Sequence, residues 1–68
     1  SNPILVRRGA LVTIRLFTAN MSLTARGKAL EDGAKGAIIR VMNMTSNKTI
    51  QVEVVADNEV RALPAMSQ

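Results

Sequence analysis

Alternating apolar and polar residues along the chain predict a series of β-strands. In residues 11–17, Val12, Ile14 and Leu16 alternate with polar positions, and β-branched residues are frequent. Residues 21–26 repeat this alternation, which predicts a second strand after a tight turn. One face of each strand is therefore expected to be buried, while the other faces water.

Three further strands are predicted in the second half of the chain. The same pattern occurs in residues 38–44, 49–55 and 60–63. Turn-forming residues at 45–48 and 57–58 separate these segments. The chain is therefore predicted to form a single, mainly β domain.

Residues 27–36 contain three of the four glycines and two adjacent acidic residues. A phosphate-binding loop would lead into a helix through a Lys-Ser or Lys-Thr pair, whereas a strand pattern follows Gly36. The side chains of Glu31 and Asp32 diverge on a helix or a strand, so they do not make a paired-carboxylate or metal site. Neither kind of site is predicted here.

We interpret this stretch as a hinge between two strands. One helical turn over residues 29–32 would place Leu30 and Ala34 on the core. Gly33 or Gly36 would then adopt the positive φ needed to enter the next strand. The glycines assigned to this structural role are Gly27, Gly33 and Gly36.

Composition narrows the possible functions. Histidine and cysteine are both absent, which removes the commonest general base and the usual nitrogen and sulfur metal ligands. The net charge is +4, but the basic residues are dispersed and Phe17 is the only aromatic residue, so a stacking surface for nucleic acid is not predicted. No apolar run approaches the roughly 20 residues of a membrane span. We predict a binding domain without catalytic, cofactor-binding or metal-binding residues.

An ordered set of motifs spans residues 6–62. The set comprises Val6-Arg7-Arg8-Gly9, Val12-Thr13-Ile14, the run from Met21 to Gly36, Ile39-Arg40-Val41-Met42-Asn43, Ser46-Asn47-Lys48, Ile50-Gln51-Val52 and Glu59-Val60-Arg61. Together these motifs resemble the C-terminal part of the flagellar basal body P-ring formation chaperones, the FlgA family. Two positions depart from the family pattern: Ala37 stands where an acidic residue is frequent, and Asn47 where glycine is usual.

The resemblance implies a SAF-type, antifreeze-like β-clip fold with short helical turns over residues 6–63. Residues 1–5 would then be a linker or a tag remnant, and residues 64–68 a flexible tail. The full protein would carry a signal peptide and a preceding domain, both absent from this sequence.

The resemblance also implies a function. It describes a non-enzymatic periplasmic chaperone, without a cofactor, that assists exported P-ring subunits to assemble around the flagellar rod. Two alternatives remain open at this point: a SAF domain of a pilus-assembly protein, and a carbohydrate-binding SAF module linked to an enzyme. A sugar site would require aromatic or carboxylate contacts, which a single Phe and scattered acids do not favour.

A surface for the protein partner is predicted from strand alternation. Burial of Val12, Ile14 and Leu16 would turn their polar and aromatic neighbours outward, and the strand at 38–44 would do the same. Phe and Met exposed beside Arg are typical of protein interfaces. The predicted partner-binding residues are Arg7, Arg8, Arg15, Phe17, Arg40 and Met42. The alternative is that Phe17 caps the core and Met42 packs under the preceding domain.

The absence of histidine, cysteine and paired acids gives a first testable expectation. Tag-free protein should show no hydrolase, transferase or metal-dependent activity. Calorimetric titration with divalent metal ions is expected to detect no stoichiometric binding. A stoichiometric site of micromolar affinity would contradict this interpretation.

Overall fold

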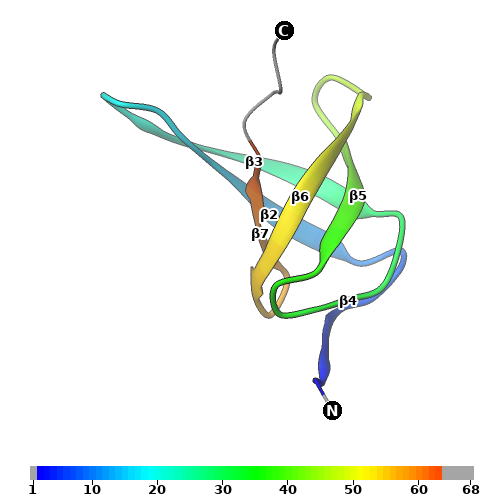
Figure 1. Ribbon diagram of the computed structural model, residues 1–68. Coiled ribbons are helices and arrows are strands. Elements are labelled where there is room, and N and C mark those ends of the chain that lie inside the picture. Colours follow the sequence, from blue (N-terminus) through cyan, green and yellow to red (C-terminus); the bar gives the residue numbers. More distant parts are fainter. Residues whose placement is uncertain (1, 64–68) are drawn as a thin grey trace, which may run out of the picture.

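The computed structural model describes residues 2–63, which form seven β-strands (Figure 1). The strands are β1 (Ile4–Val6), β2 (Leu11–Phe17), β3 (Ser22–Ala29), β4 (Gly33–Ala34), β5 (Ile38–Asn43), β6 (Thr49–Ala56) and β7 (Glu59–Ala62). The predicted mainly β fold is confirmed. Within residues 2–63 there is no helix long and apolar enough to cross a membrane.

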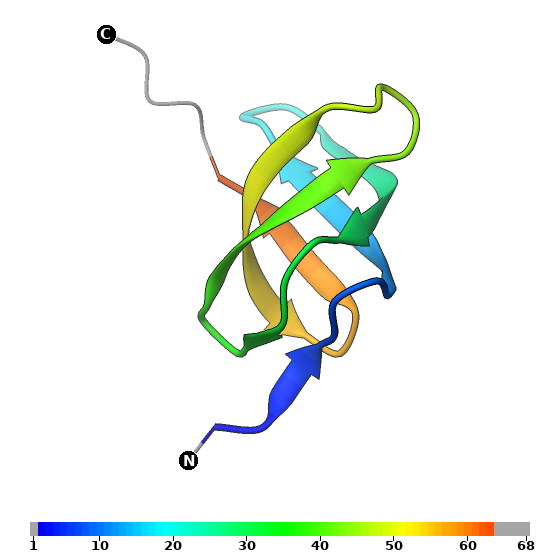
Figure 2. The same cartoon turned by 90° about the vertical axis from the view of Figure 1, so that its right-hand side faces the viewer.

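Five strands close into a barrel in the order β2-β3-β5-β6-β7, and β1 with β4 forms a separate two-stranded sheet. Figure 2 shows how the barrel strands wrap around the core, with β1 and β4 at the end that carries the N-terminus. Closure depends on a parallel pairing of β2 with β7, from Thr13 opposite Glu59 to Arg15 opposite Arg61. The other strand pairs of the barrel are antiparallel.

The core consists almost entirely of small branched side chains. Its members are Val6, Val12, Ile14, Ala29, Ile39, Val41, Val52, Val54 and Val60, each no more than 3% exposed. A fully buried side chain of this size contributes about 1.5–3 kcal/mol to stability. Strand alternation therefore explains the core, and the aromatic ring of Phe17 is not part of it.

Gly27 lies inside β3, opposite Val12 on one side and Asn43 on the other. A Cβ atom at this position would lie 2.5 Å from Cγ1 of Val41 and 2.7 Å from Cδ1 of Ile14. The barrel interior has no room for a side chain here. The structure thus places Gly27 where strands pack closely, and not in the connection predicted from the sequence.

The helical turn expected over residues 29–32 is not formed. β3 continues to Ala29, whose amide donates a hydrogen bond to the carbonyl of Ala10 at 2.9 Å. The amide of Leu30 donates to the carbonyl of Arg40 at 3.0 Å. The carbonyl of Ala29, which would close a helical turn, instead accepts a hydrogen bond from the amide of Gly9 at 2.8 Å, and residues 30–31 form a bend.

The other two glycines of the predicted hinge, Gly33 and Gly36, differ in their backbone conformation. Gly36 has a φ of 87° and its amide donates to the carbonyl of Val54 at 2.8 Å. Gly33 does not have a positive φ and is buried in β4. A Cβ atom on Gly33 would lie 2.9 Å from side-chain carbons of both Ile39 and Val54.

The first strand lies at the start of the expected domain. Ile4, within the stretch expected to be a linker or tag remnant, pairs with Ala34, and Val6 pairs with Gly33. The carbonyl of Leu5 accepts a hydrogen bond from the amide of Asn58 at 3.3 Å. The tail expected at residues 64–68 lies outside the described residues.

Substitutions at the two glycines should separate these roles. Gly36→Val is expected to destabilise the fold by about 1–3 kcal/mol through strain at positive φ. Gly36→Asn should recover part of this loss, because Asn tolerates that conformation. Gly33→Val should cost about 1–3 kcal/mol through overpacking, and Asn should not restore stability there. Urea unfolding midpoints measure both effects; unchanged midpoints for both Val variants would refute these assignments.

Candidate protein-binding site

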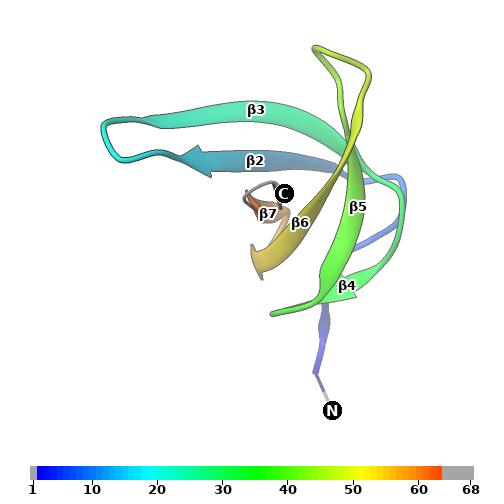
Figure 3. The same cartoon turned by 45° about the horizontal axis from the view of Figure 1, so that its top comes forward.

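The β2–β3 hairpin is longer than the barrel wall that flanks it. β2 and β3 pair with each other as far as Phe17 opposite Ser22. β7, however, pairs with β2 only over Thr13–Arg15, and β5 pairs with β3 only over Gly27–Ala29. The outer half of the hairpin therefore projects from the barrel, as Figures 1 and 3 show.

The tip of this hairpin is held by local hydrogen bonds. The amide of Thr18 donates to the carbonyl of Met21 at 2.8 Å, and the amide of Met21 donates to Oγ1 of Thr18 at 3.1 Å. The turn at Ala19 and Asn20 was predicted from the sequence at this place. These bonds extend the two strands as an ordered hairpin up to its turn.

The projecting part of the hairpin exposes large apolar side chains. Leu16 and Leu23 face each other across the strands, on the same side as Ile14 in the core. They were expected to be buried, yet they are 39% and 48% exposed because no barrel strand covers them. Phe17 is 58% exposed and Met21 is 56% exposed. We call Leu16, Phe17, Met21 and Leu23 the apolar hairpin cluster.

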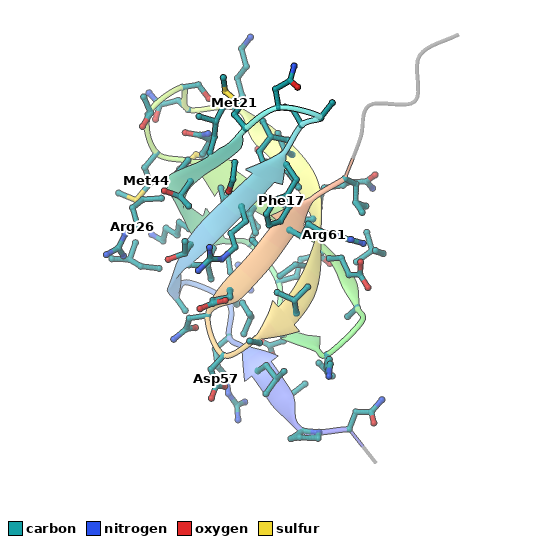
Figure 4. All side chains as sticks on the ribbon, turned by 90° about the vertical axis from the view of Figure 1, so that its left-hand side faces the viewer. Phe17, Met21, Arg26, Met44, Asp57 and Arg61 are labelled. Carbon is teal, nitrogen blue, oxygen red and sulfur yellow. The ribbon has the colours of Figure 1, made fainter. Side chains whose placement is uncertain are left out.

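An apolar cavity of about 300 Å³ lies under the hairpin at the open end of the barrel. Its apolar lining consists of Ile14, Leu16, Leu23, Ala25, Ile50 and Ala62. Thr24 and Asn43 supply its polar edge. Phe17 and Arg61 line an adjacent hollow, and Figure 4 shows these two side chains close together. The hairpin cluster is thus continuous with a recess suited to apolar side chains.

Charge is unevenly distributed around this recess. Nε of Arg15 on β2 lies 3.6 Å from Oε1 of Glu59, and Nη2 of Arg61 on β7 lies 2.6 Å from Oε1 of Glu53. Both arginines are therefore paired with a carboxylate. No acidic residue occurs in the segments 9–30 and 33–52. Within residues 2–63, Arg26 on β3 and Lys48 beside the end of β5 form no ion pair. The β3 side of the hairpin is therefore positively charged.

The predicted partner-binding residues do not form one surface. Arg15 and Phe17 lie on the outer face of β2, and Phe17 belongs to the apolar hairpin cluster. Met42 on β5 pairs with Lys28 of β3, and Lys28 pairs with Leu11 at the start of β2. Phe17 ends β2, six residues after Leu11, which corresponds to a separation of roughly 20 Å along the strand. Phe17 and Met42 therefore belong to different parts of the barrel.

The three remaining predicted residues, Arg7, Arg8 and Arg40, lie away from the hairpin tip. Arg7 and Arg8 belong to the connection between β1 and β2, where the amide of Arg8 donates to Oδ1 of Asp32 at 2.7 Å. Arg40 on β5 donates to Oε2 of Glu31 from its amide, at 2.9 Å, and from Nε, at 3.2 Å. These contacts attach the bend after β3 to β5. Arg40 therefore helps to hold this bend against β5.

Sequence reasoning missed Leu16, Met21 and Leu23 as surface residues. Their alternation with polar positions is the same as that of core residues, and only the lengths of the neighbouring strands leave them uncovered. The sequence contains one usable signal: the apolar alternation continues up to the turn at 19–20 without an acidic residue.

The chain is a small β-barrel domain that exposes an apolar hairpin on its surface. Among residues 2–63, no group of three or more His, Cys, Asp or Glu side chains is placed to hold a metal ion. The chain belongs to the family described as chaperone for flagella basal body P-ring formation, whose family model matches residues 1–62.

Two relatives and two solved structures are similar to the chain. The flagellar protein FlgA of Agrobacterium fabrum is 33% identical over 61 residues, covering 90% of this chain and 38% of that protein. The flagella basal body P-ring formation protein FlgA of Aquifex aeolicus is 36% identical over 59 residues, covering 87% and 26%. The chain thus spans well under half the length of either relative.

Crystal structures of Salmonella FlgA share the fold of the chain. The closed form has a TM-score of 0.78 at 22% identity, covering 85% of this chain and 29% of that one. The open form has a TM-score of 0.77 at 22% identity, with 85% and 28% covered. The β-barrel described here therefore corresponds to one part of those longer chains.

The contact between Glu31 and Arg40 predicts a pH dependence of stability. Hydrogen bonds from the Arg40 amide and guanidinium lower the pKa of Glu31 below its usual value. The stabilisation is therefore complete above the usual glutamate pKa of about 4.3 and is lost as the pH falls through the lower, folded-state pKa.

Glu31→Gln should remove this part of the acid sensitivity, because its side chain does not titrate. Urea midpoints of the wild type and the variant, compared from neutral to strongly acidic pH, measure the effect. The two curves should converge at low pH, and a constant difference between them would contradict the assignment.

Proposed function

We propose that this domain contacts subunits of the flagellar P-ring in the periplasm, before and during their assembly around the rod. Membership of the P-ring formation chaperone family supports the process. The observation that carries the proposed contact is the apolar hairpin cluster, Leu16, Phe17, Met21 and Leu23. Large apolar side chains gathered on one exposed element are typical of protein-binding surfaces.

A chaperone of this kind requires a surface, and not a chemical step. A subunit that has not yet joined its ring exposes apolar side chains and unpaired strand edges, which promote aggregation. The hairpin and the recess under it would cover such a surface reversibly. Burial of apolar area provides about 25 cal/mol per Å² before the entropic costs of association are subtracted.

Location and partner follow from the same proposal. Action on P-ring subunits places the full-length protein in the periplasm, which requires its export by a signal peptide, and the remaining part of the protein would act together with this domain. Family membership favours this function over the pilus-assembly and sugar-binding alternatives.

A double substitution tests the contact surface. Phe17→Ser combined with Leu23→Ser in the full-length protein is expected to weaken binding of purified P-ring subunits by about tenfold or more, because both side chains lose apolar area at the interface. Titration calorimetry measures affinity, and thermal unfolding verifies that the variant is folded.

Met42→Ser is the matched control. It also removes an apolar side chain, but from β5 at the opposite end of β2 from Phe17. Binding within about twofold of the wild type is expected, since surface substitutions away from an interface have small effects. Wild-type affinity of the folded hairpin variant, or a larger loss from Met42→Ser, would overturn the assignment of the surface.

A further inference from the structure

Among residues 2–63, no strand pairs with one edge of the projecting part of β3. β5 pairs with β3 over Gly27–Ala29, and the amide of Met44 adds one hydrogen bond to the carbonyl of Arg26 at 2.9 Å. In an antiparallel ladder, the N–H and C=O of one residue point to the same side, and successive residues alternate. Since the Arg26 carbonyl faces β5, the backbone groups of Thr24 and Ser22 point toward the same edge. β5 has ended before it reaches them.

The sequence of the β5–β6 connection explains why this edge is open. Oδ1 of Asn43 accepts hydrogen bonds from the amides of Thr45 and Ser46 at 2.8 and 3.2 Å. Asn47 has a φ of 61°, and its amide donates to the carbonyl of Asn43 at 2.7 Å. This compact turn directs the chain into β6 and away from the hairpin (Figure 3). The edge is therefore left open by an ordered turn.

The open edge borders the apolar cavity. Leu23 and Ala25 point from β3 toward the inner face, while Thr24 and Asn43 lie at the cavity rim. A strand placed beside Ser22 and Thr24 would direct every second side chain toward this inner face. The cavity of about 300 Å³ has room for such apolar side chains. Backbone groups and side-chain space thus favour the same kind of occupant.

Charge limits the occupant further. Arg26 lies on the outer face of β3, next to the open edge, and Lys48 belongs to the turn on the other side of it. Neither side chain forms an ion pair within residues 2–63. The segments 9–30 and 33–52 contain no acidic residue. A strand that carries acidic residues on its outward side would complement this edge.

We propose that the β3 edge at Ser22 and Thr24 binds an extended segment of a partner protein as an additional strand. Apolar residues of that segment face the cavity, and acidic residues on its opposite side face Arg26. This inference rests on the proposed function and deepens it, because it states which kind of segment of a P-ring subunit the domain recognises. Strand addition of this kind obtains affinity from main-chain hydrogen bonds and specificity from alternate side chains.

Hydrogen exchange of individual amides in the full-length protein, followed by NMR, tests the edge directly. In the free protein, the amides of Ser22 and Thr24 should exchange rapidly, whereas those of Leu23 and Ala25, which face β2, should exchange slowly. Purified P-ring subunits should slow the exchange of Ser22 and Thr24 by about tenfold or more, since local opening then requires dissociation. Leu23 and Ala25 serve as internal controls.

A matched pair of variants tests the same edge through affinity. Thr24→Pro removes the amide that points to the open edge and leaves the β2 ladder intact, as proline is tolerated on an edge strand. It should weaken binding by about tenfold or more, whereas Thr24→Val, which keeps the amide, should stay within about twofold. Arg26→Glu should weaken binding most at low salt, where charge pairing is least screened. If Thr24→Pro fails to fold, protection of the Ser22 and Thr24 amides from hydrogen exchange in the wild type tests the edge instead.

The outcomes separate this inference from the proposed function. Subunit binding without protection of the Ser22 and Thr24 amides, or with undiminished affinity of folded Thr24→Pro, overturns the strand inference alone.

If subunits do not bind, the proposed function fails. The edge is then tested with a heptapeptide of alternating Val and Glu, compared with one of alternating Val and Lys. Tighter binding of the Glu peptide with protection of both amides supports the edge; equal or absent binding overturns it. Protection by rising concentration of the protein alone identifies a second copy as occupant and also overturns the proposal.

Discussion

The parallel pairing of β2 with β7 closes the barrel, and it extends over three residue pairs, from Thr13 to Arg15 on β2. Because the two C-terminal strands β6 and β7 form an antiparallel hairpin, this pairing joins the end of the sheet to its beginning. It places Val60 beside Ile14 in a core of small branched side chains. Closure removes the unpaired strand edges that would otherwise promote aggregation, but only along the length over which all five strands overlap.

Beyond that length, the hairpin of β2 and β3 continues by itself. The same residue alternation that buries Val12 and Ile14 leaves Leu16 and Leu23 uncovered, since β7 and β5 do not reach them. An apolar recess and an unpaired backbone edge arise together at this point. A longer β5 would fill both and would leave a closed barrel without a contact surface. Strand length therefore determines both where the barrel is closed and where the apolar hairpin cluster is exposed.

The distribution of charge follows a similar division. Acidic residues are confined to the bend after β3 and to β6, β7 and their connection, where Glu31, Glu53 and Glu59 each pair with an arginine. These exposed pairs contribute little stability individually. Their effect on the surface is greater, because they pair Arg15, Arg40 and Arg61 with carboxylates while Arg26 and Lys48, beside the open edge of β3, form no ion pair within residues 2–63. The hairpin end of the molecule is consequently basic as well as apolar.

Most of the fold could be read from the sequence, because period-two alternation specifies which residues face a core wherever a strand is covered on one side. The strands at 11–17, 38–44 and 49–55 and the turn at 19–20 were predicted in this way, and motif order indicated the family. Alternation carries no information about where a neighbouring strand ends, so the exposure of Leu16 and Leu23 could not be predicted. The role of Gly27 depends on its distance from Val41 and Ile14 across the barrel. The expected helical turn is absent because the Ala29 carbonyl accepts a hydrogen bond from Gly9, a residue distant in sequence. Local sequence thus determined the strands and the core, whereas the relative lengths and register of strands distant in sequence determined the surface.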